Sequence, residues 1–342
     1  MEINPTVSVV MSVYNGERFL KEAIESILRQ AYQDFEFIII DDGSTDSTFD
    51  LIRYYRDIDS RITSCIKTHS GLIDSLNLAA KLARGRWLSI MDCDDVAVPE
   101  KLMVQLDFLS QNPDIALLGS SMLNTDENLN PVFLQSYPQN HDDIIKMMRY
   151  QNCFSHPAMV INKEAFLKAG GYRTAFLHAE DFDLSLRLLR KHKAANITDP
   201  LIKRRIHKGS ISLHNLRQQV VSAIAARIAS QLDPDPFEKV IFDAPVSKVF
   251  VTGHGVDESA LAREIVRNFI FLAQLLIRCN SYADATVLFN SENFTGLEME
   301  LLPEELGNMK GALLKSGLYT QSLDEIVSAV YLNFSSRAQH ST

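Results

Sequence analysis

Residues 86–95, Arg-Trp-Leu-Ser-Ile-Met-Asp-Cys-Asp-Asp, join an apolar run to three carboxylates within four positions. The run at 86–91 has the length and composition of a buried strand. Clustered carboxylates raise one another's pKa unless a cation is present. An Asp-x-Asp at the carboxyl end of a parallel strand can hold Mg²⁺ or Mn²⁺, which prefer oxygen ligands and bridge to phosphates. The stretch therefore predicts a divalent-metal site or, more simply, a solvated acidic turn.

Apolar strands and amphipathic helices alternate around this stretch. The predicted strands are 7–13, 35–40 and 86–91, and the predicted helices are 17–30, 47–55 and 71–84. Gly85 is expected just past the last of these helices, and Pro99 is expected to open the next one. Such alternation is typical of an α/β fold with a mainly parallel sheet covered on both faces.

The pattern changes twice further along the chain. Beyond about residue 112 we expect short strands at 115–119, 132–134 and 158–161, with helices at 142–150 and 180–192. From about residue 213, helical periodicity dominates. The predicted organisation is a first domain over 1–214, with parts at about 5–112 and 113–214, and a helical C-terminal domain or extension over 215–342.

Composition limits the class of protein. The 342 residues are enough for two domains, and 46% hydrophobic and 23% charged residues are ordinary for a soluble globular protein. A net charge of −9 argues against a nucleic-acid partner. Four scattered cysteines fit a reducing compartment, and neither a signal peptide nor a membrane-spanning stretch is evident. The expected location is the cytoplasm.

A second acidic junction, Asp41-Asp42-Gly43-Ser44-Thr45-Asp46, directly follows the strand at 35–40. Gly43 permits a tight turn, and Ser44 or Asp46 can cap the next helix, so a structural junction is the simpler interpretation. The junction after the first strand, at 12–16, lies at the same sheet edge. Since ligands bind beyond the carboxyl ends of parallel strands, these junctions together favour one ligand crevice.

These junctions, 9–16, 41–46 and 91–95 with Pro99, together resemble family 2 of the nucleotide-sugar glycosyltransferases. More matching segments follow in family order, namely Ser155-His156-Pro157-Ala158, Gly170-Gly171-Tyr172, Ala179–Leu184 with Arg187, and Arg205-Ile206-His207 with Ser210 and Ser212. The resemblance covers about residues 5–212, and the combination of motifs is specific although no single motif is. It implies a GT-A fold, with nucleotide binding in 5–112 and acceptor binding in 113–214.

The resemblance also implies donor-side roles, residue by residue. Asp42 is matched to the carboxylate that accepts a hydrogen bond from the base, and Asp92 to the ribose side. Asp94 is matched to the direct metal ligand on the diphosphate, with Mn²⁺ or Mg²⁺ as the cofactor, whereas Asp95 is expected to be structural. The implied nucleotide-sugar-binding residues are Ser12, Tyr14, Asp42, Asp92, Asp94 and Arg205.

On the acceptor side, Asp181 is matched to the general base that deprotonates the acceptor hydroxyl. Its simpler interpretation is an acidic residue that stabilises a helix N-terminus. Glu180 and His156 are expected in the acceptor or sugar pocket, where His156 can equally be a structural histidine. His207 is expected to complete the metal site or contact the diphosphate, and Arg205 either balances phosphate charge or belongs to a basic strand face.

The leading hypothesis is an inverting, metal-dependent glycosyltransferase that moves a sugar from a nucleotide-sugar to a saccharide or lipid-linked saccharide hydroxyl in cell-surface polysaccharide synthesis. UDP is the carrier that the resemblance favours. A nucleotidyltransferase acting on sugar phosphates is the first alternative, but residues 14–18 hold only one Gly and one Arg. A non-catalytic domain that binds a nucleotide-sugar or a glycan is the second alternative. The presence of all the acidic residues of the matching motifs argues against it.

The helical periodicity of residues 215–342 is compatible with three different roles. Its apolar faces can pack on the catalytic domain, form a homodimer interface or rest peripherally on the inner face of the cell membrane. Core packing is the commonest fate of such periodicity.

Overall fold

The computed structural model describes residues 4–210, 215–233, 235–237, 245–279, 288 and 294–315. The described residues belong to two compact units, one formed by Met1–Arg205 and Ala226–Pro245, the other by Ile206–Ala225 and Val246–Thr342. The first segment of the first unit thus ends at Arg205, the last residue of β9 (Lys193–Arg205), and not at residue 214. The unit also includes a second segment, residues 226–245, which lies beyond the expected division at 214/215.

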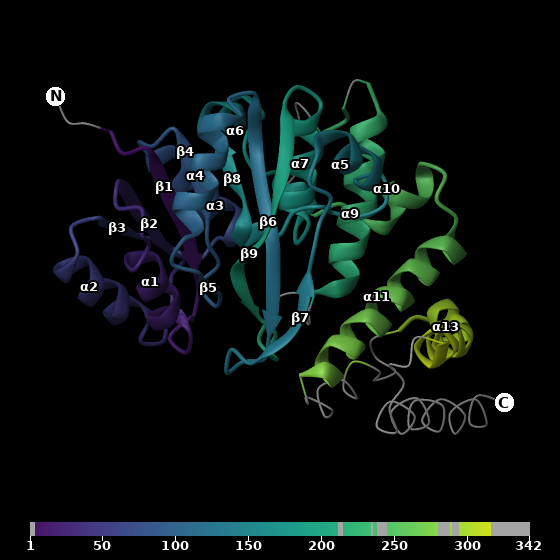
Figure 1. The fold of residues 1–342 in the computed structure, drawn as a ribbon. Helices are drawn as coiled ribbons and strands as arrows, with labels where there is room; N and C mark the ends of the chain where they lie inside the picture. Colours follow the sequence, from purple (N-terminus) through teal and green to yellow (C-terminus); the bar gives the residue numbers. More distant parts are fainter. Residues whose placement is uncertain are drawn as a thin grey trace. The chain divides into compact units, whose positions relative to one another are not determined.

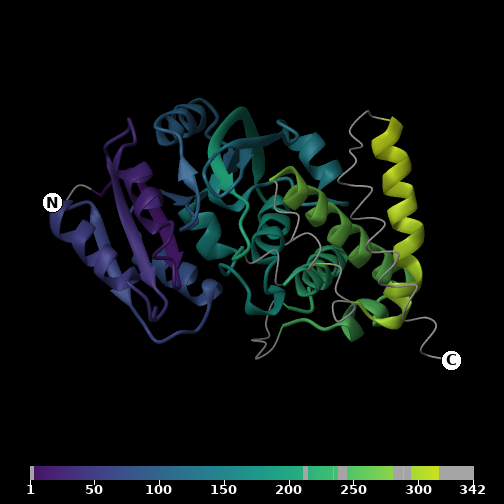
Figure 2. The ribbon, with the colours of Figure 1, turned by 90° about the horizontal axis from the view of Figure 1, so that it is seen from below.

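The N-terminal half of the first unit contains four parallel strands in the order β3-β2-β1-β4 (Figure 1). Every residue of β1 and β2 is buried, so both faces of this part of the sheet are covered. Figure 2 shows helices on both sides of it. The strands are β1 (Val7–Val13), β2 (Phe35–Asp41), β3 (Ile62–Ile66) and β4 (Trp87–Ile90), and the helices are α1 (Leu20–Leu28), α2 (Thr48–Ile58) and α3 (Leu72–Leu82).

The sheet continues through β8, β6, β9 and β5, with β7 paired to β6. Because β8 is antiparallel to both β4 and β6, the complete sheet is mixed. These strands are β5 (Val96–Ala97), β6 (Ile115–Thr125), β7 (Pro131–Gln135), β8 (Val160–Asn162) and β9 (Lys193–Arg205). The accompanying helices are α4 (Lys101–Gln111), α5 (His141–Met147), α6 (Lys163–Lys168) and α7 (Glu180–Leu189), with short 3₁₀ turns η1 (His156–Ala158) and η2 (Thr174–Phe176).

The predicted strands β1, β2 and β4 are confirmed to within one or two residues. Strands β3, β5 and β9 were not predicted. The 13-residue β9 carries exposed polar positions in its middle, and its pairing with β6 and β5 stabilises it despite that composition. Short edge strands such as β3 and β5 have too few residues for a clear pattern.

Two predictions about helix ends, those for Gly85 and Pro99, were wrong. Helix α3 ends at Leu82, so Gly85 is not its cap. A Cβ at Gly85 would lie 2.6 Å from the Ser8 nitrogen, and the close approach to β1 explains the glycine. Helix α4 begins at Lys101 with Glu100 as its N-cap, so Pro99 precedes the helix.

The regular secondary structure in the described part of the second unit is helical, as expected. Helices α11 and α13 pack together, with Arg263 and Arg267 both paired to Glu305. None of the helices among the described residues is long and apolar enough to cross a bilayer. Its helices are α10 (Lys248–Gly253), α11 (Glu258–Arg278) and α13 (Gly296–Lys315), and α9 (Leu216–Gln231) contributes to both units.

Candidate active site

The carboxyl end of β2 brings Asp42 against the loop at 67–71. Asp42 is buried, and its carboxylate accepts the N–H groups of Ser70 (3.0 Å) and Gly71 (2.8 Å) and a bond from Lys67 Nζ. Burial acts to raise the pKa of Asp42, but Lys67 and the two backbone donors outweigh it and hold the pKa below its ordinary value. Asp42 is therefore an anion in a fixed loop.

Two exposed rings lie next to this carboxylate. Tyr14, just beyond β1, is 46% exposed, and its ring centroid lies 4.1 Å from that of His69 with the planes tilted by 32°. His69 Nδ1 is 2.9 Å from Asp42 Oδ2. Ser12, within β1, is almost fully buried. Tyr14 and His69 thus present aromatic surface to solvent beside a carboxylate.

The acidic run follows β4, and the Met91 N–H donates to the Val10 carbonyl at 3.1 Å. Asp92 and Asp94 are half-buried, whereas Asp95 is buried and its Oδ1 accepts the Arg205 N–H at 2.9 Å. Burial raises the pKa of Asp95 well above its ordinary value, and the charges of Asp94 and Asp92 add to the rise. The expected crowding of negative charge is present, and Asp95 has a structural contact.

Arg205 lies behind this run. Its side chain is 1% exposed, and it donates from Nη1 to the Asp94 carbonyl oxygen at 2.9 Å and from Nη2 to Glu22. Its guanidinium carbon also lies 4.7 Å from the centroid of the Phe19 ring. The guanidinium therefore fixes the backbone of Asp94 from inside the protein.

Helix α4 anchors two parts of the site through buried polar side chains. Lys101 Nζ donates to Ser89 Oγ at 2.7 Å and to the Ile90 carbonyl at 3.4 Å, at the end of β4. One turn on, Gln105 Nε2 donates to the Ala158 carbonyl at 2.7 Å, in η1. Burial lowers the pKa of Lys101 to about 7, against the opposing charge of Asp92. A buried lysine in the first turn of a helix is unfavourable, and the nearby carboxylates offset part of that cost.

His156 connects the acidic run with the acceptor side. Its Nδ1 is 3.0 Å from Asp92 Oδ1, and its Nε2 is 3.2 Å from the Tyr172 hydroxyl. Burial acts to lower the pKa of His156, but Asp92 outweighs it, together with Asp181 and Glu180, and raises the pKa to about 9. The imidazole is therefore cationic near neutral pH. Its charge interacts with Asp92 and with the pair Glu180 and Asp181.

Glu180 and Asp181 open helix α7. Glu180 is buried, and its Oε2 has no hydrogen-bond partner among the described residues. Asp181 accepts from Asn152 Nδ2 at 2.8 Å and from the Phe182 N–H at 2.7 Å. Burial raises the pKa of both carboxyl groups, and the charge of Asp181 helps to raise that of Glu180 to about 7. Carboxylates with raised pKa values are suited to accept a proton from a hydroxyl.

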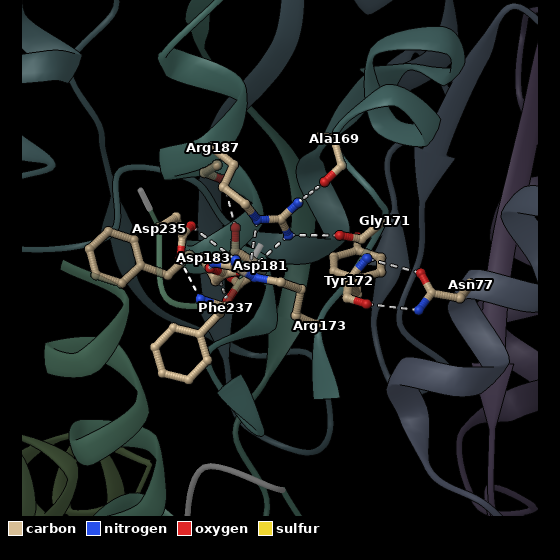
Figure 3. A network of polar contacts seen from close by, with 12 residues as sticks. Asn77, Ala169, Gly171, Tyr172, Arg173, Asp181, Asp183, Arg187, Asp235 and Phe237 are labelled. Atoms are coloured by element: carbon tan, nitrogen blue, oxygen red, sulfur yellow. Dashed lines mark hydrogen bonds and ion pairs between the residues drawn. The ribbon is translucent and has the colours of Figure 1, made fainter. Parts of the chain in front are cut away.

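A buried ionic network supports the start of α7 (Figure 3). Asp183 is 1% exposed and accepts from Arg173 (Nε, 3.0 Å) and from Arg187 (Nη2, 2.7 Å). Arg173 also donates to Asp235 at 3.0 Å, and Arg187 to the Gly171 carbonyl at 2.7 Å. The network thus links α7, the loop at 169–173 and the segment that returns to the first unit.

The donor atoms at the acidic run fit a divalent cation. Asp92 and Asp94 are half-buried carboxylates, and their charges add to the effect of burial in raising the pKa of Asp95, so a cation would balance negative charge here. Across the described ranges, no three His, Cys, Asp or Glu side chains are grouped to hold a metal. His207 lies in the second unit, where its Nδ1 accepts the Gly209 N–H at 3.2 Å, and its role as a ligand stays a prediction.

Several residues of the site had no signal in the sequence. Asn152 and Lys67 belong to none of the motifs. Lys101, at the start of an amphipathic helix, has the pattern of a surface residue. Tyr172 stands in the Gly170-Gly171-Tyr172 motif, but the target of its hydroxyl depends on the folding of two distant segments.

The chain is similar in sequence to known glycosyltransferases. The model of "Glycosyl transferase family 2" matches residues 8–171. The O-antigen biosynthesis glycosyltransferase WbnJ of Escherichia coli is 32% identical over 216 residues, which cover 61% of this chain and 83% of that protein. The putative glycosyltransferase EpsE of Bacillus subtilis is 30% identical over 259 residues, which cover 73% of this chain and 91% of that protein.

Solved structures show the same fold. TarS residues 1–349 of S. aureus, in complex with UDP-GlcNAc, gives a TM-score of 0.53 at 15% identity and covers 98% of this chain and 92% of that chain. The mannosyltransferase PcManGT of Pyrobaculum calidifontis, in complex with GDP-Man and Mn²⁺, gives 0.52 at 17% identity, with 98% and 87% covered.

The sequence relatives define a glycosyltransferase, and its fold is a GT-A-like mixed sheet with additional C-terminal helices. The chain belongs to glycosyl transferase family 2. The predicted fold class and enzyme class are thereby confirmed.

Glu180→Gln is expected to stabilise the first unit above neutral pH. The pKa of Glu180 is raised from 4.5 to about 7, so the folded state binds more protons than the unfolded state between these values. Stability is therefore lost as the pH rises through this window, by about 3 kcal/mol in total. Glutamine carries no charge, so the variant should gain about 2 kcal/mol at pH 8 and little at pH 5.

Urea unfolding followed by the fluorescence of Trp87, the single tryptophan, measures this difference. Glu164→Gln, on the exposed pair with Lys168, is the matched control and should show no such pH dependence. Equal stability of Glu180→Gln and the parent at pH 8 would contradict the prediction.

Proposed function

We propose that this glycosyltransferase is inverting and metal-dependent, and that it transfers a sugar from a nucleoside-diphosphate sugar, with UDP as the expected carrier, to a hydroxyl of a saccharide or lipid-linked saccharide. The observation that carries the proposal is the arrangement of three carboxylates about one imidazole. Asp92 contacts His156 at 3.0 Å, and the charges of Asp181 and Glu180 also act on the pKa of the same His156. Asp92 suits the donor, and the pair Glu180 and Asp181 suits the acceptor.

The donor would lie along the carboxyl ends of β1, β2 and β4. Tyr14 and His69 offer ring surface for the base, and Asp42 lies beside them. Asp92 would serve the ribose side and Asp94 the diphosphate, with Arg205 holding the Asp94 backbone. Mn²⁺ or Mg²⁺, with Asp94 as the proposed ligand in the first unit, would supply positive charge to the departing diphosphate.

On the acceptor side, Asp181 would accept the proton of the attacking hydroxyl. The Asn152 and Phe182 donors hold its carboxylate in place, and burial keeps its pKa raised. The unpartnered Glu180 Oε2 can hydrogen-bond another hydroxyl of the acceptor or the sugar. Attack from the face opposite the diphosphate would convert an α-linked donor to a β-linked product.

The names of relatives support a role in polysaccharide synthesis. WbnJ is named for O-antigen biosynthesis and AmsE of Erwinia amylovora, 27% identical over 200 residues, for amylovoran biosynthesis. A lipid-linked acceptor would bring the protein to the inner face of the cell membrane, as a cytoplasmic, peripherally bound enzyme. The helical C-terminal region would form the interface of a homodimer.

A panel of UDP- and GDP-sugars, incubated with the protein and Mn²⁺, tests the proposal. We expect one donor to be hydrolysed slowly, with release of free nucleoside diphosphate, and EDTA to stop the reaction. Release of pyrophosphate from nucleoside triphosphate and sugar phosphate would indicate a nucleotidyltransferase instead. Failure to cleave any donor, with or without metal, would favour a binding domain.

A further inference from the structure

Tyr172 is a buried residue whose hydroxyl reaches the centre of the site. It is 3% exposed, and its hydroxyl lies 3.2 Å from His156 Nε2. The other ring nitrogen of His156 lies 3.0 Å from Asp92 Oδ1. The Tyr172 ring packs edge-on against Phe166, with 5.2 Å between centroids. A phenylalanine would fill the same volume, so packing does not account for the hydroxyl.

The backbone of Tyr172 is held from two helices (Figure 3). The side chain of Asn77, on α3, accepts the Tyr172 N–H and donates to the Tyr172 carbonyl, both at 2.9 Å. Arg187, on α7, donates to the preceding carbonyl of Gly171 at 2.7 Å. Gly171 has a φ of +69°, and a Cβ there would lie 2.6 Å from Asn77 Oδ1. The position of the Tyr172 hydroxyl is therefore determined by contacts on both sides of the loop.

We propose that Tyr172 is a positioning residue for sugar transfer, whose hydroxyl orients His156 and, through it, the Asp92 carboxylate. This inference rests on the proposed function of the same site. The hydrogen bond can form in either protonation state of His156, because a hydroxyl can donate to a neutral Nε2 or accept from a protonated one.

The consequence for the donor side is specific. With His156 Nδ1 directed at Asp92 Oδ1, Asp92 Oδ2 is oriented for other partners. Loss of the Tyr172 hydroxyl would leave the imidazole free to rotate and Asp92 without a defined orientation. A single misoriented hydrogen-bonding group costs a factor of about ten in rate.

The test is a double-mutant cycle of Tyr172→Phe and His156→Gln. Tyr172→Phe alone should lower kcat about tenfold with the KM for acceptor changed less than about twofold. In the His156→Gln background the same change should have no further effect, because its target is gone. Equal losses in both backgrounds would overturn the proposal, as would an unchanged kcat in Tyr172→Phe.

Tyr55→Phe is the matched control, since the Tyr55 hydroxyl donates to Glu25 at 2.7 Å between α2 and α1, outside the site. A second measurement does not require catalysis. The imidazole NMR signals of His156, assigned by their loss in His156→Gln, should shift in Tyr172→Phe and not in Tyr55→Phe. If the parent transfers no sugar, the proposed function fails, whereas unshifted His156 signals would overturn the role of Tyr172.

Discussion

Asp181→Asn should reduce sugar transfer by about 10³-fold or more and leave nucleotide binding within about twofold. The amide cannot accept a proton from the acceptor hydroxyl. It has the same shape as the carboxylate, and its oxygen can still accept the Phe182 N–H, a bond of 2.7 Å in the parent. Asn152, which donates to Asp181 at 2.8 Å, must rotate its amide to accommodate the substitution. The fold should therefore persist while the chemistry is lost.

The measurement compares kcat for transfer with the Kd of the released nucleoside diphosphate, determined by calorimetry. Asp107→Asn, on the exposed face of α4, is the control and should keep full activity. Glu180→Gln should retain more activity than Asp181→Asn if Asp181 is the base. More than a tenth of parental turnover in Asp181→Asn would remove Asp181 from that role.

Asp183→Asn is expected to have the largest effect on stability, a loss of about 3–5 kcal/mol in the free energy of unfolding of the first unit. Asp183 is buried between Arg173 and Arg187 (Figure 3). Without its charge, two guanidinium groups that are 15% and 10% exposed would keep one buried carboxylate partner among the described residues, Asp235, which pairs with Arg173. Breaking one member of a buried network is costly because it leaves charge uncompensated.

Urea unfolding followed by Trp87 fluorescence reports on this unit alone, because the chain has no other tryptophan. Asp114→Asn is the matched control, since the Asp114–Lys193 pair is 2.8 Å long but more than half exposed at both ends. It should leave the unfolding midpoint almost unchanged, because a solvent-exposed ion pair contributes little to stability. Equal midpoints for the Asp183 and Asp114 variants would show that the network contributes no more than a surface ion pair.

Local pattern was enough to predict three of the four parallel strands in the N-terminal half of the first unit. The strands β1, β2 and β4 are runs of buried apolar residues, so their composition alone identifies them. The junctions that follow them lie at one edge because the strands are parallel. The predicted crowding at Asp92, Asp94 and Asp95 is found for the same reason, since it concerns neighbours in the chain.

Contacts between distant segments were decided only by the tertiary structure. Arg205 has the sequence context of a basic surface patch, but pairing of β9 with β6 and β5 buries it behind Asp94. Lys101 becomes a buried amine because the start of α4 lies against the end of β4. The contacts of His156 with Asp92 and Tyr172 join three segments that share no local pattern. The sequence by itself determined the types of residue at the strand ends, whereas the fold determined which of them meet, because hydrogen bonds and burial depend on distance in space.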